Sequence, residues 1–287
     1  METFELRYFT SVARHENIHR ASEKTGVSPA SLSKAIGRLE DELSVKLFTR
    51  EGRHIKLTDQ GRLLQQRASE IIRLEESARL EIGGHLGTIQ IVIAGPEVLL
   101  SKMGLTLTAS IKKMFPNSVF EYHATDDTHA LEQVMRGEAH LAIVTSEPPK
   151  ELTSKLLGEA KFQTFVGQGH PFYGMAKSKK SVSVEEVLKH AFVSPSNPLL
   201  GKVGIKQSLD GWRDDEFPRR VEYLTSSLKT LEELVISGRA IAYLPDYFCK
   251  NLDLQILKIN GCPYSCTQKV KLVARNPKEV GWLNQIF

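Results

Sequence analysis

Three helical patterns and one alternating pattern occupy the first 57 residues of the chain. Apolar side chains recur at helical spacing over 4–15, which predicts an amphipathic helix, and Asn17 is a plausible cap for a second short helix over 18–25. A third helix is predicted over 28–43. Two short segments then flank Glu51-Gly52-Arg53, so residues 46–57 are expected to form a two-stranded hairpin.

The third helix has a clear start signal. Ser28 precedes Pro29. A serine side chain accepts hydrogen bonds from the free amides of a first helical turn, and proline at the first helical position gives up no hydrogen bond. Four apolar residues at helical spacing then form one stripe, with polar residues opposite. The stripe consists of Leu32, Ile36, Leu39 and Leu43.

A single long helix is expected from Thr58 to about His85. At ~1.5 Å per residue it would span roughly 42 Å, which is long for a helix packed within one small domain. An approximate heptad seam favours pairing with the same helix of a second chain, and the alternative is a helix that lies on its own domain. Gly83, Gly84 and Gly87 then form a hinge. The seam consists of Leu64, Ala68, Ile71, Ala78 and Ile82.

Strands and helices alternate from residue 88 onward. Ile89–Ala94 is a continuous apolar run, as in buried parallel strands. Later apolar segments, among them 162–166 and 254–259, alternate with helical ones. This alternation predicts an α/β fold with an open sheet, and some 200 residues suffice for two lobes with ligand space between them. The expected domains are a winged helix–turn–helix over 1–57, a linker helix and hinge over 58–87, and a two-lobed domain over 88–287.

Composition narrows the class of protein. The chain has 287 residues and a mass of 32.1 kDa, with 41% apolar and 25% charged residues, which is ordinary for a globular protein. Its start has no signal-peptide pattern and no stretch is apolar enough to span a membrane, so a cytoplasmic protein without membrane contact is expected. Three cysteines, Cys249, Cys262 and Cys266, are too few for a disulfide framework.

Positive charge gathers around the hairpin. The net charge is +4, and residues 43–67 carry enough excess Lys and Arg to account for all of it. A solvated loop and helix face would explain this segment without any partner, whereas a nucleic-acid surface would use it to neutralise phosphates.

A short helix, a tight turn at Gly26-Val27 and a second helix form the geometry that places one helix in a DNA major groove. The first turn of the second helix would face base edges, and its cations would neutralise phosphates. The hairpin tip would be a basic wing for backbone or minor-groove contact. An ordinary helical hairpin is the alternative. The predicted contacts to double-stranded DNA are Ser28, Pro29, Ala30, Ser31, Ser33, Lys34, Arg38, Arg50, Arg53 and His54.

Residues 26–61 carry a specific string. It reads Gly26-Val27-Ser28-Pro29-Ala30-Ser31-Leu32-Ser33-Lys34-Ala35-Ile36, followed by Arg38-Leu39-Glu40, Leu43, Leu47-Phe48, Arg50, Arg53, Leu57-Thr58 and Gly61. With this string the chain resembles the winged helix–turn–helix of LysR-type transcriptional regulators, and the spacing matches without gaps. Weaker similarities at 115–116, 137–144, 169–171 and 238–245 extend the resemblance over nearly the whole chain.

The resemblance implies a bacterial transcription regulator that pairs through residues 58–85 and assembles further into a tetramer. It also implies two lobes similar to periplasmic binding proteins, with a small-molecule effector in their cleft, and RNA polymerase as a further candidate partner. Pro29 and Ala35 stand where the family often has Gln or Arg, so base readout would depend more on Ser31, Lys34, the wing and DNA shape. Ser44 stands where the family usually has Gly.

Ligands of open α/β sheets bind beyond the carboxyl ends of the strands. Helix N-termini and hydroxyl groups at those ends favour an anionic effector, but Glu97, Asp126 and Asp127 would repel one, so a cationic or neutral effector stays open. Plain loop and cap roles are the alternative for each residue. The candidate effector residues are Gly95, Pro96, Glu97, Thr125, Asp127, Thr128, Ser196, Asn197, Thr225 and Ser226.

Catalytic, metal and cofactor signatures are not found in the sequence. There is no nucleophile–base pattern, phosphate-binding loop or dinucleotide fingerprint, and the spacing of Cys262 and Cys266 is not a zinc pattern. No enzyme activity, metal or cofactor is therefore expected. The runs Glu185-Glu186 and Asp214-Asp215-Glu216 have no evident partner and are expected on solvated surface. A solute sensor whose head contacts protein, and an enzyme with a catalytic cleft, are the competing functions.

Overall fold

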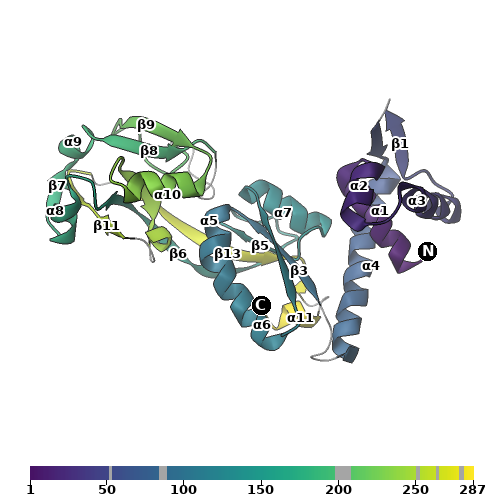
Figure 1. Cartoon of the computed structure of the whole chain (residues 1–287). Coiled ribbons are helices and arrows are strands. Elements are labelled where there is room, and N and C mark those ends of the chain that lie inside the picture. Colours follow the sequence, from purple (N-terminus) through teal and green to yellow (C-terminus); the bar gives the residue numbers. More distant parts are fainter. Residues whose placement is uncertain (52–53, 84–88, 198–207, 250–252, 263–264, 278–280) are drawn as a thin grey trace.

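The computed structural model describes the whole chain except residues 52–53, 84–88, 198–207, 250–252, 263–264 and 278–280. Figure 1 shows three parts in a row: a helical head (residues 1–57), a middle lobe called lobe I (residues 89–161 and 267–287) and an outer lobe called lobe II (residues 162–266). A long helix, α4 (Asp59–Gly83), extends from the head past lobe I.

The head consists of three helices and a hairpin around a small apolar core. Leu6, Phe9, Leu32, Leu39 and Leu47 are fully buried at its centre. The elements are α1 (Thr3–His15), α2 (Ile18–Thr25), α3 (Pro29–Leu43), β1 (Phe48–Glu51) and β2 (His54–Leu57). The predicted helices and hairpin are confirmed.

Capping side chains begin α3 and α4 as the sequence predicts. The Ser28 hydroxyl accepts a hydrogen bond from the Ser31 amide at 3.2 Å, and the Thr58 hydroxyl accepts one from the Gly61 amide at 2.9 Å. Gly61 is required by close approach, because a Cβ there would lie 2.2 Å from the Leu47 carbonyl oxygen. The first turn of α4 is therefore packed directly against the head.

Ser44 ends α3 in the left-handed conformation, with φ of +54°. A side chain at such a position costs roughly 1–2 kcal/mol relative to glycine, part of which glycine loses again through its unfolded-state entropy. We expect Ser44→Gly to raise the free energy of unfolding of the head by about 0.5–1 kcal/mol in urea titrations. Ser33→Gly, at an exposed position inside α3 of the same head, is the control and should lower that free energy. Equal destabilisation by both substitutions would contradict the backbone argument.

The predicted seam of α4 is only partly free. Leu64, Ala68 and Ile71 pack against the head's own core, and Ala68 is fully buried. This corrects the prediction that these three residues face a second chain. Among the described side chains of α4, the apolar ones that remain exposed are Ala78 and Ile82, which belong to the predicted seam, and Leu63 and Leu74, which do not. Since α1 occupies one side of α4, the sequence period alone could not tell which side was left over.

Lobe I is built on three parallel strands, β3 (Gln90–Gly95), β4 (Val119–Ala124) and β5 (Leu141–Val144). Strand β3 lies between the other two, and its apolar residues fill the core, as predicted for a buried parallel strand. The helices are α5 (Glu97–Leu99), the π-helical turn η2 (Leu100–Gly104), α6 (Leu105–Met114), α7 (Asp127–Arg136) and α11 (Gly281–Asn284).

Two long antiparallel strands connect the lobes. Strand β6 (Thr153–Gly167) pairs with β13 (Thr267–Ala274) over its first part and with lobe II strands over its second. The sequence predicted only residues 162–166 of β6, because its first part alternates poorly and faces solvent. The segment predicted as one strand over 254–259 is two short strands that pair with different partners.

Lobe II completes the mixed sheet order β10-β6-β13-β5-β3-β4. Its parallel pair of β8 (Ala191–Pro195) and β9 (Arg220–Thr225) ends at the same edge as helix α10 begins. The remaining elements are α8 (Tyr173–Lys177), β7 (Ser181–Ser183), α9 (Val184–Val187), α10 (Leu228–Ile236), β10 (Ala242–Pro245), η3 (Asp246–Cys249), β11 (Leu254–Ile256) and β12 (Lys258–Asn260). Within the described parts of both lobes and the head, no helix meets the length and apolarity of a membrane span.

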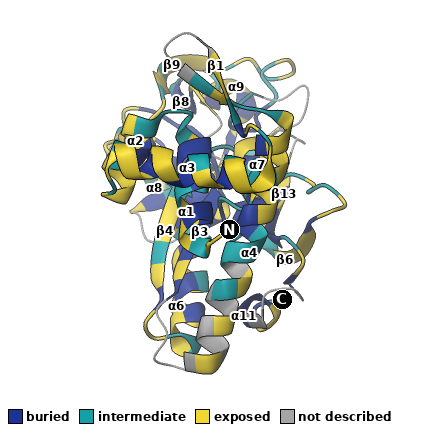
Figure 2. Ribbon diagram, turned by 90° about the vertical axis from the view of Figure 1, so that its right-hand side faces the viewer, coloured by how far each residue is buried: buried dark blue, intermediate teal, exposed yellow. Residues whose placement is uncertain are grey.

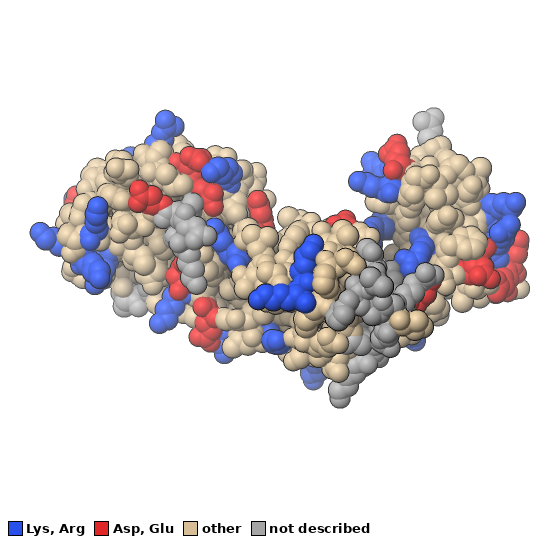
Figure 3. Space-filling view, turned by 60° about the horizontal axis from the view of Figure 1, so that its bottom comes forward, with Lys and Arg blue, Asp and Glu red and all other residues tan. Residues whose placement is uncertain are grey.

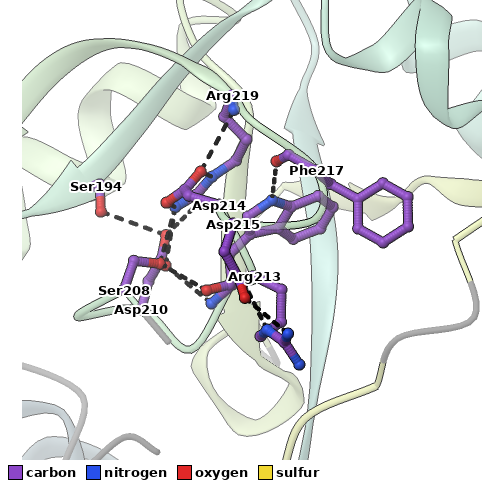
Figure 4. A network of polar contacts seen from close by, with 9 residues as sticks. Ser194, Ser208, Asp210, Arg213, Asp214, Asp215, Phe217 and Arg219 are labelled. Atoms are coloured by element: carbon purple, nitrogen blue, oxygen red, sulfur yellow. Dashed lines mark hydrogen bonds and ion pairs between the residues drawn. The ribbon is translucent and has the colours of Figure 1, made fainter. Parts of the chain in front are cut away.

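One guanidinium organises residues 208–219, which lead into β9 (Figure 4). Arg219 is fully buried, donates to Asp210 at 2.6 Å and to Asp214 at 2.8 Å, and stacks between Phe192 and Trp212. Asp215 and Glu216 accept from Arg213. The prediction that the acidic run 214–216 has no partner is therefore wrong, because folding brings it to two arginines that lie next to it in sequence. Its predicted place at the surface is confirmed for Asp215 and Glu216, which are exposed.

His170 of lobe II is buried beside His190, with ring centroids 5.0 Å apart. Burial, reinforced by His190, lowers the pKa of His170 from its ordinary 6.5 to about 4. Between these values the unfolded chain binds more protons at this histidine than the folded chain does. The contribution of His170 to the free energy of unfolding is therefore complete above pH ~6.5 and is lost as the pH falls toward 4.

We therefore expect the free energy of unfolding to decrease as the pH is lowered through this window, and the decrease to be smaller in His170→Gln. Urea titrations at a series of pH values measure both slopes. His19→Gln, an exposed histidine of the head, is the control and should keep the wild-type slope. Identical slopes in all three proteins would exclude His170 as the titrating group.

Candidate nucleic-acid interface and effector edge

The outer face of α3 presents a polar surface to solvent. Ala30, Ser31, Ser33 and Lys34 are exposed on it, while the apolar side of the same helix is buried in the head (Figure 2). Lys34 has no ion-pair partner among the described residues. This face can therefore approach a polyanion without breaking an internal contact.

A shallow groove of about 290 Å³ runs beside the start of α3. It brings together Pro29, Ala30 and Ser33, which the sequence predicted, with His19 of α2 and Ile55 of the hairpin. His19 was missed by the sequence analysis. Its exposed place at the start of the first helix of the pair was the available signal, since that helix crosses the DNA backbone when the second lies in the groove.

The remaining predicted contacts differ in how free they are. The Ser28 hydroxyl is held by α3, because it caps the first turn and lies 2.9 Å from the Ser31 hydroxyl. Arg38 lies 3.6 Å from Glu5 but is 57% exposed, and Arg50 is exposed on β1. Arg53 lies outside the described residues. His54 begins β2, where its backbone pairs with Glu51, and its side chain is not described.

Internal ion pairs reduce the excess charge around the hairpin. Lys46 donates to Glu40, Arg62 pairs with Asp59, and Arg67 pairs with Glu70. Burial opposes the charged form of Glu40, but Lys46 and the amide of Leu47 outweigh it and lower the pKa of Glu40. Glu40 thereby ties α3 to the start of the hairpin, which makes it a positioning residue for the wing.

Lobe I holds an ordered edge at the carboxyl ends of its parallel strands. Asp127, at the start of α7, is only 4% exposed, and its Oδ2 accepts from the amides and hydroxyls of both Thr145 and Ser146 at 2.7–3.0 Å. This corrects the prediction that Asp127 lines the effector surface. The side chain lies beneath the edge and fixes the loop that follows β5.

The other residues of this edge divide into buried and exposed ones. Gly95 and Pro96 are buried, and a Cβ on Gly95 would lie 2.3 Å from the Ile143 carbonyl oxygen, so Gly95 is needed for packing. Asp126 caps α7 by accepting from the His129 amide at 3.0 Å. Glu97 and Thr128 are exposed and Thr125 is half-buried.

Lobe II holds a second edge where β8 and β9 end together. The Ser196 amide donates to the Thr225 carbonyl at 2.9 Å, and the Thr225 hydroxyl accepts from the Ser227 amide at 3.0 Å at the start of α10. Ser196, Asn197 and Ser226 are exposed. Four predicted residues thus lie together on one lobe, and the Arg219 network supports them from behind through the Ser194 hydroxyl, which lies 3.4 Å from Asp210.

Known sequences and structures resemble the chain over almost its full length. Two curated proteins of Bacillus subtilis are similar: the uncharacterized HTH-type transcriptional regulator YybE (27% identical, covering 88% of this chain and 85% of that one) and the transcriptional dual regulator GltC (28%, covering 86% and 81%). A full-length OxyR variant from Pseudomonas aeruginosa has a TM-score of 0.67 at 20% identity, covering 99% and 94% of the two chains. Full-length CbnR in complex with its target DNA has a TM-score of 0.59 at 17% identity, covering 99% and 98%.

Two family models match in series. "Bacterial regulatory helix-turn-helix protein, lysR family" matches residues 4–62, and "LysR substrate binding domain" matches residues 88–279. The first match covers the head with the exposed face of α3, and the second covers both lobes with their two edges. This chain therefore belongs to the LysR family of DNA-binding transcriptional regulators, with a helix–turn–helix head and an effector-binding domain.

Proposed function

We propose that the chain binds its operator through the outer face of α3, with the β1–β2 wing on the flanking backbone. The observation that carries this assignment is the exposed row Ala30, Ser33 and Lys34 on a helix whose opposite side is buried in the head. In this proposal Ser31 and Ser33 face base edges, and Lys34, Arg38 and Arg50 neutralise phosphates. His19 joins the backbone contacts.

The test is binding to the DNA upstream of its own gene. Lys34→Ala should weaken binding by a dimer about tenfold, because each protomer loses a phosphate contact worth roughly 0.5–1 kcal/mol. The slope of log affinity against log salt should become shallower by about 1 per protomer. Fluorescence anisotropy over a salt series gives both values.

Lys24→Ala is the matched control, since Lys24 is an exposed cation of the head outside the α3 face. Its affinity and salt slope should stay close to those of the wild type. Unchanged binding in Lys34→Ala would refute the assigned face, and no binding by the wild type at low ionic strength would favour a head that contacts protein.

We further propose that two copies pair through α4. The stripe of Leu63, Leu74, Ala78 and Ile82 supports this assignment, because these apolar side chains lie on α4 outside the head's core. Pairing places two α3 helices on a two-fold DNA site. We also propose that dimers assemble into a tetramer and that the regulator contacts RNA polymerase. The chain is divided into a DNA-binding domain (1–57), a linker helix and hinge (58–87) and an effector-binding domain (88–287). The regulator acts in the cytoplasm, without a catalytic step.

We propose that a small-molecule effector binds between the edge of lobe I and the edge of lobe II. The exposed polar groups of lobe I, Glu97, Thr125 and Thr128, and those of lobe II, Ser196, Asn197, Thr225 and Ser226, support this site. A thermal-shift screen of metabolites on the wild type identifies a ligand, and the same screen on Thr128→Val tests the site. The ligand should stabilise the wild type more than the variant. A ligand that stabilises both proteins equally would place the effector elsewhere.

A further inference from the structure

The linker helix α4 meets lobe I at two places, the end of α7 and α11. At the first of these, Ser69 and Glu70 of α4 meet Gly137, which ends α7, and Arg275, which follows β13. We call this point the α4–lobe I contact. Two adjoining hollows of about 550 and 590 Å³ lie beside it, lined by residues of the head, α4 and lobe I. Figure 3 shows a notch in the surface between the head and the rest of the molecule.

The backbone of lobe I touches α4 directly. Gly137 has φ of +72°, and a Cβ there would lie 2.5 Å from the Cβ of Ser69. Two separate reasons therefore call for glycine, the left-handed backbone and the close approach. Ser69 is 9% exposed, and its hydroxyl donates to the Gln65 carbonyl at 2.9 Å inside α4.

An ion pair lies beside this backbone contact. The Arg275 guanidinium donates to Glu70 at 2.8 Å and to the Met135 carbonyl at 3.1 Å. Met135 is in the last turn of α7, where a cation is favourable toward the negative end of the helix. The two side chains are only 13% and 26% exposed, so the pair is screened less than a surface pair.

Each lobe I element at this contact leads to the effector edge or to the second lobe. Helix α7 begins at Asp127, which holds the loop at Thr145 and Ser146, and ends at Gly137, ~15 Å away along its axis. Strand β13 ends at Ala274, next to Arg275, and pairs with β6, which continues into lobe II. A change in the edge or in the angle between the lobes would therefore move Gly137 and Arg275.

Resting on the proposed function, we infer that the α4–lobe I contact is the point through which the effector domain sets the orientation of the DNA-binding head. A shift of the Asp127 edge displaces helix α7 and so the Gly137 backbone that contacts Ser69. A change in the angle between the lobes displaces β13 and so Arg275, which pairs with Glu70. Because coupling between two binding sites is reciprocal, DNA bound to the head must also change the edge. The inference can therefore be tested before the effector is known.

Hydrogen–deuterium exchange on the full chain tests it, with and without an operator duplex selected from a random library. Arg275→Gln removes the ion pair, and Ser69→Leu inserts a side chain where the Gly137 backbone leaves no room. In the free protein, both variants should exchange severalfold faster over 65–72 and 133–138. Ser110→Leu and Glu233→Gln are the matched controls: Ser110 makes the same i to i−4 hydrogen bond on an exposed helix, and Glu233 pairs with Lys229 in lobe II.

Operator binding should alter exchange of the Thr145 and Ser146 amides in the wild type and both controls, and this effect should be lost in Arg275→Gln and Ser69→Leu although they still bind the duplex. Unchanged exchange over 65–72 and 133–138 in the free variants would overturn the inference. So would a DNA effect at the edge that persists in them or is missing in the wild type. A wild type that binds no duplex would remove the proposed function, a failure that a gel shift reports on its own.

Discussion

Replacing Arg219 with alanine is expected to lower the free energy of unfolding of lobe II by about 3–5 kcal/mol, because it leaves the buried carboxylate of Asp210 without its counter-ion and also removes the partner of the partly exposed Asp214. Asp210 is 1% exposed and Arg219 is 0% exposed at its side chain. Burial lowers the pKa of Arg219, but the bonds and charges of Asp214 and Asp210 outweigh it and raise that pKa. A loss of this size is a large share of the ~5–15 kcal/mol that holds a typical domain.

The two tryptophans allow the loss to be assigned to one lobe. Trp212 packs at the Arg219 network in lobe II, whereas Trp282 lies in lobe I. In a Trp282→Phe background, urea unfolding followed by fluorescence reports lobe II alone. Arg219→Lys keeps the positive charge but not the planar guanidinium. Its free energy of unfolding should lie between those of the wild type and Arg219→Ala.

Arg220→Ala is the matched control, one residue away. Its side chain is 62% exposed and pairs with Glu222 on the surface, so the expected change is within about 0.5 kcal/mol. If Arg219→Ala and Arg220→Ala unfold at the same urea concentration, the network does not stabilise lobe II. The Ser196–Thr225 edge should lose effector binding together with lobe II in Arg219→Ala.

Replacing Leu74 with glutamate is expected to weaken pairing of two copies by at least about 30-fold. Leu74 is 54% exposed in the single chain, and in a two-fold assembly the substitution places an unpaired charge in the interface from each protomer, at roughly 1–3 kcal/mol each. Affinity for a two-fold operator should fall with it, because single heads then bind half-sites independently. Sedimentation velocity over a concentration series measures the dimer constant.

Leu224→Glu serves as the control for an exposed leucine elsewhere, since Leu224 is 70% exposed on β9. Its dimer constant should match that of the wild type. A Leu74→Glu protein that stays dimeric at the same concentrations would show that α4 does not form the interface and that another surface does.

The head could be predicted from the sequence almost entirely, because its signals are local. A capping serine, a proline at the first helical position and a stripe at 3.6-residue spacing act within one or two turns, and the structure has α3 where they predict it. The apolar run of β3 was equally readable, since a strand covered on both faces needs no alternation. The exposed side of α3 follows from the same stripe.

Only the tertiary structure determined which side chains and backbone groups contact each residue. From the sequence, the charge run at 214–216 was expected to have no partner, but Arg219 and Arg213 fold back on it. Asp127 was expected to face the effector, but Thr145 and Ser146 enclose its carboxylate. The seam of α4 changed for the same reason, since α1 covers Leu64 and Ile71. Helical and strand periods specify which residues share a face. They do not specify which group lies opposite that face, because this depends on how turns and other segments of the chain fold back against it.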